Sequence, residues 1–330
     1  MPSTLPPLPC DAVLPARAVA SNRAIGPLAR PKAVTNRIVW RYAAPIATLH
    51  VLALFVVLPW LFSWTGVVLM VGGIYFYGGL GINIAYHRLL THGSFKCPLW
   101  LERSFVTVAL CCMEDAPASW VATHRLHHND TDEQADPHSP LVSFLWSHVG
   151  WLMLENRDVR CISAYERFAR DVLRDPFYLK LERTLLPIWI YLGHALLYFL
   201  AGMAAGWAMS LGWMGSVQFG LSLLVWGVIL RTVLVWHVSW SVNSLTHLYG
   251  YRSYDTAENS RNNWFVALLA SGEGWHNNHH QDPASASNAH RWWELDPIYL
   301  FICGLEKLGL AWNVIRPRHL RRDGGSQGTG

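Results

Sequence analysis

The chain has 330 residues, of which 52% are hydrophobic and only 15% are charged, whereas an ordinary soluble domain has roughly 25% charged residues. Its net charge of +4 suits contact with anionic lipid headgroups better than nucleic-acid binding, because no basic stripe with interleaved aromatic residues is present. The six cysteines form no CxxC pair, which suits a reducing compartment. This composition indicates a membrane protein.

The two ends of the chain lack the composition of a folded domain. Residues 1–40 are rich in Pro and Ala and have no apolar core of signal-peptide length, so we expect a mostly disordered cytoplasmic lead. Residues 316–330 end in RRDGGSQGTG and are expected to form a disordered tail. The single domain of the protein is then expected over residues 41–315.

Two stretches of the chain, residues 42–86 and 184–230, contain no Asp, Glu, Lys or Arg. A helix needs about 20 residues to cross the hydrocarbon core, so each stretch is long enough to cross twice. We predict an all-α membrane protein with four transmembrane helices, arranged as two hairpins below which a cytoplasmic helical cap carries the functional site. The predicted spans are residues 43–62, 66–86, 185–206 and 217–240.

The charges flanking the hairpins predict their orientation. Six Lys and Arg residues precede the first hairpin between positions 17 and 41, and neither hairpin turn carries a charge. By the positive-inside rule, both termini and the segments near 87–183 and 241–330 are cytoplasmic. We favour a bacterial inner membrane over the endoplasmic reticulum.

Histidines gather in these cytoplasmic segments. The strings HRLHH and HNNHH place imidazoles at positions i, i+3 and i+4, which share one face of a helix. A third string, HRLLTH, spaces two histidines five residues apart, about 140° around an α-helix, so they converge only if the helix ends or loosens. In a fourth, NSLTH, an asparagine and a histidine lie one turn apart. The candidate metal ligands are His87, His92, His124, His127, His128, Asn243, His247, His276, His279 and His280.

Nine histidines are too many for one ion with four to six ligands, so we expect two ions. Iron is favoured over zinc, because zinc has no redox chemistry to offer to oxygen and apolar chains. The soluble type of di-iron site needs two Glu-x-x-His motifs, and only Glu273 to His276 makes one.

By contrast, His50, His194 and His237 are expected to be packed or interfacial side chains. Arg231, about 21 Å into the fourth span, is expected to have a structural partner or a water-filled cavity.

The strings HRLLTHGSF, HRLHHNDTDEQADPHSP, SHVGWLM, VNSLTH and GEGWHNNHH resemble the membrane-bound fatty acyl desaturases of the stearoyl-CoA (delta-9) type, from about residue 40 to 315. The resemblance implies that the nine histidines hold two irons, with Asn243 contributing through a water molecule. It makes five acidic residues candidates to orient imidazoles, although a solvated surface explains each of them equally well. These acids are Asp132, Glu133, Asp136, Glu258 and Asp282.

The resemblance also implies the reaction, which is the O2-dependent introduction of a cis double bond, at delta-9, into a long acyl chain. Animal relatives hold coenzyme A with charged residues just before the second histidine string, or histidine box, which is HRLHH here. This chain reads SWVATHRLHH at that point, so both acyl-CoA and acyl-lipid remain open as substrates. Trp120 lines an acyl tunnel or packs in the core. Because no donor domain is present, a separate ferredoxin, rubredoxin or cytochrome b5 type of electron donor with its reductase is implied.

Two other functions compete with desaturation. One is a lipid or carotenoid hydroxylase or ketolase of the same histidine-box superfamily. The other is a multi-pass metal transporter, which is disfavoured because transport sites lie near the bilayer midplane, whereas these boxes lie at or beyond the cytoplasmic ends of the spans.

Overall fold

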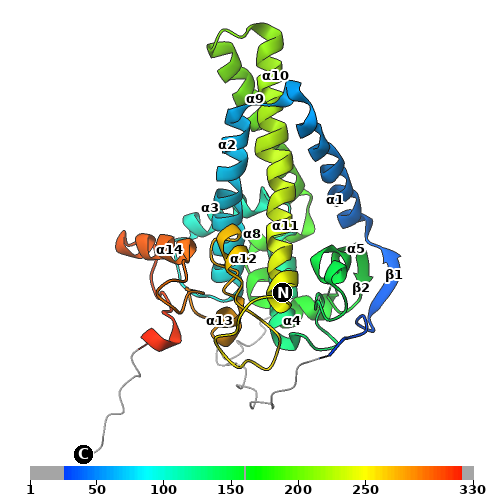
Figure 1. Cartoon of the computed structure of the whole chain (residues 1–330), viewed down its shortest axis with the longest axis vertical. Coiled ribbons are helices and arrows are strands. Elements are labelled where there is room, and N and C mark those ends of the chain that lie inside the picture. The colour runs from blue at the N-terminus through cyan, green and yellow to red at the C-terminus, as the bar shows by residue number, and fades with distance from the viewer. Residues whose placement is uncertain (1–25, 160, 322–330) are drawn as a thin grey trace, which may run out of the picture.

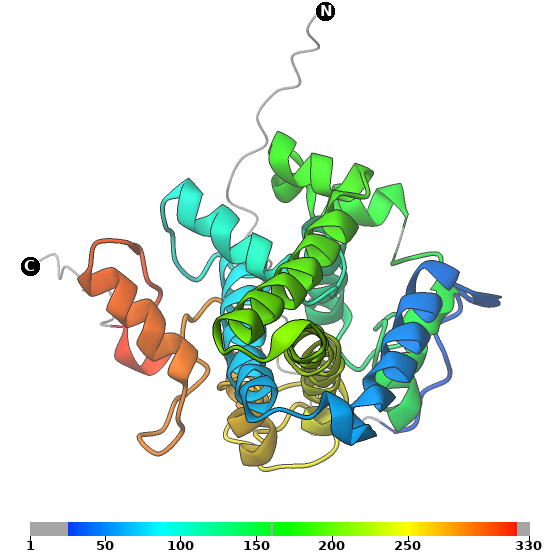
Figure 2. The same ribbon diagram turned by 90° about the horizontal axis from the view of Figure 1, so that it is seen from above.

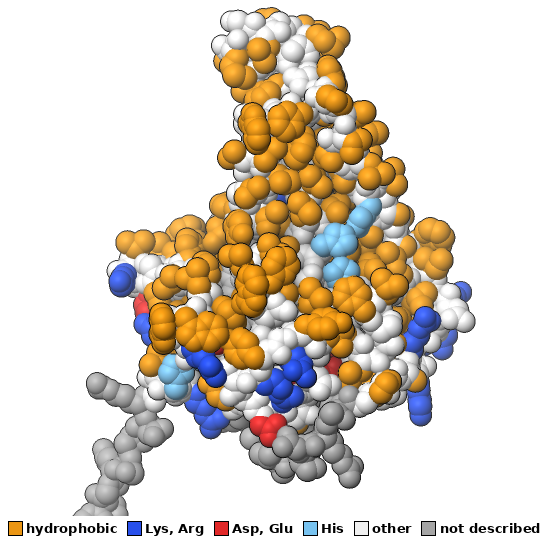
Figure 3. Space-filling view, in the orientation of Figure 1, with side chains coloured by type: hydrophobic (Ala, Val, Ile, Leu, Met, Phe, Trp, Pro, Cys, Tyr) orange, Lys and Arg blue, Asp and Glu red, His pale blue; other side chains and the backbone are white. Residues whose placement is uncertain are grey.

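Four long apolar helices form a stalk that rises from a wider lobe in the computed structural model, which describes residues 26–159 and 161–321 (Figure 1). Hydrophobic side chains cover the stalk, while most of the visible Lys and Arg residues lie on the lobe (Figure 3). Such an apolar surface is stable in lipid and not in water, so the stalk is the membrane-embedded part. Most of the sequence expected to be disordered, residues 1–25 and 322–330, lies outside the described residues.

The four helices that are long and apolar enough to span a membrane form two hairpins, as predicted. The first span covers Trp40–Val57 and consists of α1 (Trp40–Ala53) and η1 (Leu54–Val57). The second span covers Trp64–Thr91 and consists of α2 (Trp64–Gly73) and η3 (Ile74–Thr91). The third is α9 (Leu186–Ala208). The fourth covers Gly212–His247, as α10 (Gly212–Leu224), η5 (Val225–Leu230), α11 (Arg231–Ser244) and η6 (Leu245–His247).

The ends of the helices differ from those that we predicted from the charge-free stretches. The first span ends at Val57 because a short turn, η2 (Pro59–Leu61), follows it. The second and fourth spans continue past the predicted residues 86 and 240, to Thr91 and His247. Both extensions enter the lobe and bring histidines with them, since an absence of charge marks the lipid-facing part of a helix and not its end.

Small residues let the second hairpin pack closely. A Cβ atom added at Gly202 of α9 would lie 2.7 Å from the Cα atom of Gly220 on α10, and one added at Gly206 would lie 2.7 Å from the Cα atom of Ser216. This is the close backbone approach that small residues provide between helices in lipid. The turn between the two helices uses the left-handed backbone region at Ser210 and Gly212.

Short helices build the lobe. Most lie around the ends of the spans, and α14 lies outside the bundle on the side away from α1 (Figures 1 and 2). They are α3 (Leu99–Leu110), α4 (Pro117–Asp130), η4 (Trp146–Gly150), α5 (Trp151–Met153), α6 (Ile162–Phe168), α7 (Arg170–Leu173), α8 (Pro176–Arg183), α12 (Trp264–Leu269), α13 (His276–Gln281), α14 (Pro297–Lys307) and η7 (Arg318–Leu320).

Two described segments differ from the disordered ends that the sequence suggested. Strand β1 (Val34–Ile38) pairs antiparallel with β2 (Leu154–Asn156), so residues 34–38 gain backbone hydrogen bonds that composition does not reveal. Near the other end, residues 316–321 pack on the lobe, where Arg321 forms an ion pair with Asp282 at 2.5 Å.

Polar side chains inside the stalk have partners there. The buried guanidinium of Arg231 donates to the carbonyl oxygen of Cys111 at 2.9 Å and lies 4.1 Å from the ring centre of Tyr77, so its structural partners are a backbone group and an aromatic face. His50 on α1 contacts His237 on α11, with 3.1 Å between their Nε2 atoms. These histidines are packed side chains, as expected, and belong to neither of the clusters described next.

Candidate metal centre

The first pair of histidines is brought together by an unusual helix. Residues Ile74–Thr91 are wound as a π-helix, in which hydrogen bonds join residues five apart. The N–H of His92 accordingly donates to the carbonyl oxygen of His87 at 3.1 Å, and the two ring centres lie 4.8 Å apart. This is the loosening that the five-residue spacing requires.

The remaining histidines come from three other segments. Helix α4, which begins with a proline at its first position, carries the second box, and α13 carries the third. The end of the fourth span, η6, supplies His247. Four segments that are far apart in sequence therefore meet at one place below the spans.

The nine histidines form two separate groups, and within each group the possible ligand atoms all lie within 4.8 Å of one another. The first group has five members: His87, His92, His124, His128 and His279. The second has four members: His127, His247, His276 and His280.

Each His-x-x-His-His box is divided between the two groups. His124 and His128 of α4 join the first group, whereas His127 joins the second. In α13 the division is reversed, because His276 and His280 join the second group. Position i+4 lies about 40° past position i on a helix and position i+3 about 60° short of it, so the first and last imidazoles aim one way and the middle one aims another. The expectation that all three aim together does not hold.

The nitrogen atoms in each group are spaced as ligands of one ion. The Nε2 atoms of His87 and His279 lie 3.1 Å apart, and those of His276 and His280 lie 3.0 Å apart. Two nitrogens at right angles around an ion, with bonds of about 2.1 Å, would be about 3.0 Å apart. The buried Nε2 atoms of His92 and His127 have no hydrogen-bond partner among the described residues. The donor set therefore fits metal ions.

Burial keeps most of these imidazoles in the form that binds metals. Burial, followed by the neighbouring histidines, lowers the pKa of His128 to about 3 and those of His124 and His279 well below the usual value. A neutral imidazole has a free lone pair, which a protonated one lacks.

Carboxylates lie behind several imidazoles. Asp136 lies 3.0 Å from Nδ1 of His127, and Asp132 lies 3.1 Å from Nδ1 of His247. Glu258 is more distant, at 3.9 Å from Nδ1 of His280. A carboxylate in this position fixes the ring orientation and leaves Nε2 for the metal.

The two other acids that the sequence suggested do not have this position. The carboxylate of Asp282 pairs with Arg321 and accepts from the N–H of Arg318, because the C-terminal segment folds over it. Glu133 lies on an exposed turn after α4.

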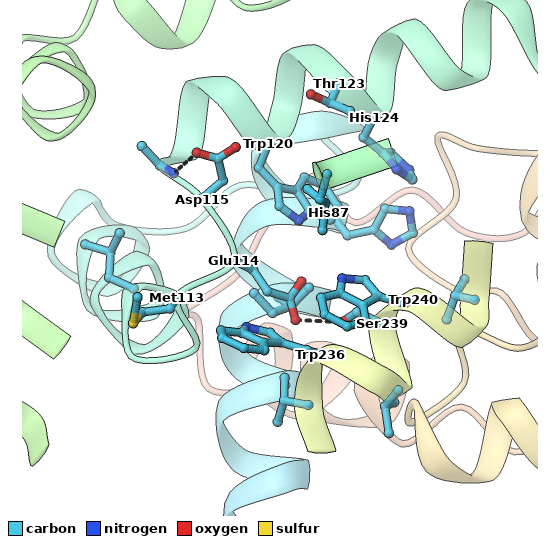
Figure 4. A pocket seen from close by; sticks show the side chains of 18 of the residues that line it. His87, Met113, Glu114, Asp115, Trp120, Thr123, His124, Trp236, Ser239 and Trp240 are labelled. Atoms are coloured by element: carbon cyan, nitrogen blue, oxygen red, sulfur yellow. Dashed lines mark hydrogen bonds between the residues drawn. The ribbon is translucent and has the colours of Figure 1, made fainter. Parts of the chain in front are cut away.

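A cavity of about 400 Å³ leads to the histidines. Its walls are mostly apolar and include Ile46, Ile74 and Leu110, while His87 and His124 lie on its inner wall (Figure 4). The ring of Trp120 stacks on that of His124, with 4.9 Å between centres. Trp120 therefore lines a cavity of the kind expected for an acyl tunnel.

Comparison with known proteins identifies this arrangement. Residues 58–302 match the fatty acid desaturase family. The chain belongs to that family. This desaturase is 41% identical over 266 residues to an sn-1 stearoyl-lipid 9-desaturase of Anabaena variabilis, which covers 81% of this chain and 90% of the relative. It is 36% identical over 291 residues to an sn-2 palmitoyl-lipid 9-desaturase of Nostoc sp. (strain 36), which covers 88% of this chain and 95% of the relative. It is also 40% identical over 277 residues to acyl-CoA 5-desaturase AL21 of Anemone leveillei, which covers 84% and 79% of the two chains.

Family membership makes the protein an oxidoreductase that desaturates acyl chains. The hydroxylase or ketolase alternative is not favoured, since the relatives named above are desaturases. The transporter alternative is set aside for the same reason.

Two residues of the desaturase site were not found from its sequence. Glu273 lies 2.8 Å from Nδ1 of His87, and its other oxygen accepts from Arg88 at 2.8 Å. Burial alone would raise the pKa of Glu273, but Arg88 and His87 hold it at about 2, so the carboxylate is ionised. His138 is buried with its ring centre 4.3 Å from that of His127.

The sequence gave little indication that Glu273 or His138 lies at the site. Glu273 stands in the one Glu-x-x-His string, which suggested only a ligand of the soluble di-iron type. Its real neighbour is 186 positions away, so no local spacing points to the contact. His138 belongs to the string ADPH, in which Asp136 was the residue expected to orient an imidazole.

Proposed function

We propose that the protein introduces a cis double bond at carbon nine of a saturated acyl chain, using O2 and two iron ions. The observation that carries the proposal is that two groups of histidines meet at the inner end of an apolar cavity that lies among the membrane helices. The names of two relatives, which act at position nine of stearoyl or palmitoyl lipids, support the position of the bond.

We assign one iron to each group of histidines. Five imidazoles hold the first iron and four hold the second, where Asn243 contributes through a water molecule. Support for Asn243 comes from its place on the cavity wall together with His276 of the second group. Iron is assigned over zinc because removing two hydrogens from an alkane is an oxidation, and zinc has no redox chemistry. The irons supply the activation of O2 that an unactivated C–H bond requires.

The protein's own residues position the chain. The apolar cavity excludes water and holds the hydrocarbon beside the histidines, so that the target carbons are presented in one orientation. Trp120 forms part of the wall next to His124, which keeps the chain close to the first group of histidines. The carboxylates behind the imidazoles keep the ligands in place during turnover.

The acyl chain is carried on a membrane lipid. The cavity is lined by residues at the lobe ends of α1 and α9, among them Arg41 and Leu185, which is the level where headgroups meet hydrocarbon. Two carboxylates, Asp115 and Glu182, are the charged neighbours of Arg41 there. Such a site would repel the phosphates of coenzyme A, whereas a lipid chain reaches it without leaving the bilayer.

Electrons come from a separate protein. Reduction of O2 to water takes four electrons, of which the two C–H bonds supply two, so a donor supplies the remaining two. We propose a ferredoxin, rubredoxin or cytochrome b5 type of donor with its reductase. It docks on the lobe, which is cytoplasmic together with both termini, and the membrane is a bacterial inner membrane. The catalytic domain covers residues 41–315.

Expression in a host without its own desaturase tests the reaction. Stearate deuterated at carbons nine and ten should give a cis alkene that has lost two deuteriums, and this alkene should appear in intact lipids before it appears in acyl-CoA. His279→Ala, which loses a ligand of the first iron, should give none. A hydroxylated main product would instead support the hydroxylase alternative, and an acyl-CoA alkene that appears first would contradict the lipid carrier.

A further inference from the structure

One ionisable side chain projects into the apolar cavity from the loop between α3 and α4. The carboxyl of Glu114 points toward α11, where the hydroxyl of Ser239 donates to it at 2.8 Å (Figure 4). The rings of Trp236 and Trp240 flank this contact. Glu114 is not near either group of histidine ligands in sequence, and its position is not explained by metal binding.

No cation compensates this carboxyl within the cavity. Among the described residues that line it, Arg41 is the only Lys or Arg, and its charged neighbours are Asp115 and Glu182. A carboxylate that is surrounded by hydrocarbon without a cation is far more costly than a neutral carboxylic acid.

The other titratable groups around Glu114 do not supply a charge. Its electrostatic neighbours are the phenol of Tyr86 on η3 and the thiol of Cys112 on its own loop. From α4 and α11 it meets Trp120 and Ser239, which do not titrate in the ordinary range. Farther along the cavity wall lie the imidazoles of His87, His124, His138 and His276.

Burial raises the pKa of Glu114 to about 8, although hydrogen bonds from Ser239 and Trp120 act in the opposite direction. The side chain is therefore mainly protonated at neutral pH. When an acyl chain fills the cavity it displaces the remaining water, so burial becomes more complete and the protonated form is favoured further.

We propose that Glu114 works as a neutral carboxylic acid, and that the cavity accepts an acyl chain only when this carboxyl is protonated. The neutral acid joins the α3–α4 loop to α11 through Ser239 without placing a charge against the hydrocarbon. It is a positioning residue, and chain binding to its ionised form takes up one proton. This inference rests on the acyl chain occupying the cavity, as proposed above.

The coupling fixes the sign of the pH dependence. Below pH 8 the carboxyl is protonated and chain affinity is constant. Above it, the competent fraction falls, so the apparent affinity should drop about tenfold for each further pH unit, until the pKa of the complex is reached.

Two variants test this dependence. Glu114→Gln is neutral at every pH and keeps an oxygen for Ser239, so its kcat/KM should not fall between pH 8 and more alkaline values as that of the wild type does. Glu166→Gln, the same change at an exposed position on α6, should keep the alkaline fall. An equal fall in Glu114→Gln and in the wild type would overturn the proposal.

A second measurement does not depend on turnover. The infrared carbonyl band of a protonated carboxyl should appear in the spectrum of the iron-loaded wild type minus Glu114→Gln, which cancels all other carboxyls. The band should fade as the pH rises through about 8, and phosphatidylglycerol with stearoyl chains should restore it. A difference spectrum without this band at neutral pH would overturn the proposal. A band that titrates and returns with lipid, in a protein that makes no alkene, would count against the proposed function and support the proton coupling.

Discussion

The N–H of His92 donates to the carbonyl oxygen of His87 at 3.1 Å, which closes a turn of the helix that is one residue longer than an α-helical turn. The two rings lie 4.8 Å apart because of this turn. Inserting an alanine after Leu90 should lengthen the spacing to six residues and turn His92 away from the first histidine group, since each added residue rotates the next side chain by about 100°. We expect iron content to fall by about half and activity by more than about 100-fold, since a ligand is lost.

Leu90→Ala is the matched control, because it places an alanine at the same point and keeps the length of the helix. It should retain most of its iron, as measured by elemental analysis of the purified protein. Full iron content in the insertion variant would mean that the five-residue turn is not needed to bring the two histidines together.

Glu273 holds the ring of His87 from behind, so its removal should weaken metal binding without removing a ligand. Glu273→Gln is expected to lower iron affinity about 10–100-fold, as judged by the chelator concentration that removes half of the iron. Asp282→Asn provides the comparison, because the carboxylate of Asp282 pairs with Arg321 and, among the described residues, bonds to no imidazole of the two groups. Equal iron loss in the two variants would contradict the role given to Glu273.

Removing the metals should destabilise the lobe, because it leaves buried nitrogens such as those of His92 and His127 without partners. The temperature of unfolding in detergent should fall when a chelator strips the protein, and Fe²⁺ should restore both stability and activity. Zn²⁺ should restore stability alone. Activity in the zinc-loaded protein would rule out the redox role of iron.

The part of the cavity away from the histidines should set the length of chain that is accepted. Gly78 and Ile74 line it on η3, and Gly78 precedes His87 by nine residues, about 14 Å along a helix. Gly78→Leu should shorten the cavity and shift the product ratio from stearoyl toward palmitoyl chains by about tenfold or more, since an added side chain must displace methylene groups. Gly72→Leu, on the lipid-facing side of α2, should leave the ratio unchanged in a gas-chromatographic profile.

The proposed topology puts both hairpin turns on the outer face of the membrane. Cysteines at the exposed positions Trp64 and Trp213, in a background without native cysteines, should react with an impermeant reagent added to intact cells. A cysteine at Arg170, exposed on α7 of the lobe, should react only after the cells are opened. Labelling of all three from outside would contradict the orientation.

The sequence was informative about the spans and the ligands, because lipid imposes an absence of charge and a helix imposes a fixed spacing. It could not show where the helices end, since Thr91 and His247 lie in extensions beyond the lipid-facing residues. Nor could it show β1, whose stability comes from pairing with a strand 120 positions away.

The grouping of the histidines was only partly accessible from the sequence. Helical spacing separates His127 from His124 and His128, but which residues complete each group depends on segments that are far away in the chain. Glu273 and Glu114 could not be assigned for a similar reason. Each has its partner on another element, His87 in one case and Ser239 in the other.

The dispersal of the histidines has a consequence for how the protein matures. His87 and His279 are 192 positions apart, and no single hairpin carries a complete group. The ribosome must therefore finish both hairpins and α13 before either site can hold an ion firmly, so insertion into the membrane precedes metallation. With iron as the proposed metal, cells short of iron should accumulate inserted apoprotein whose lobe lacks the stabilisation that bound ions provide.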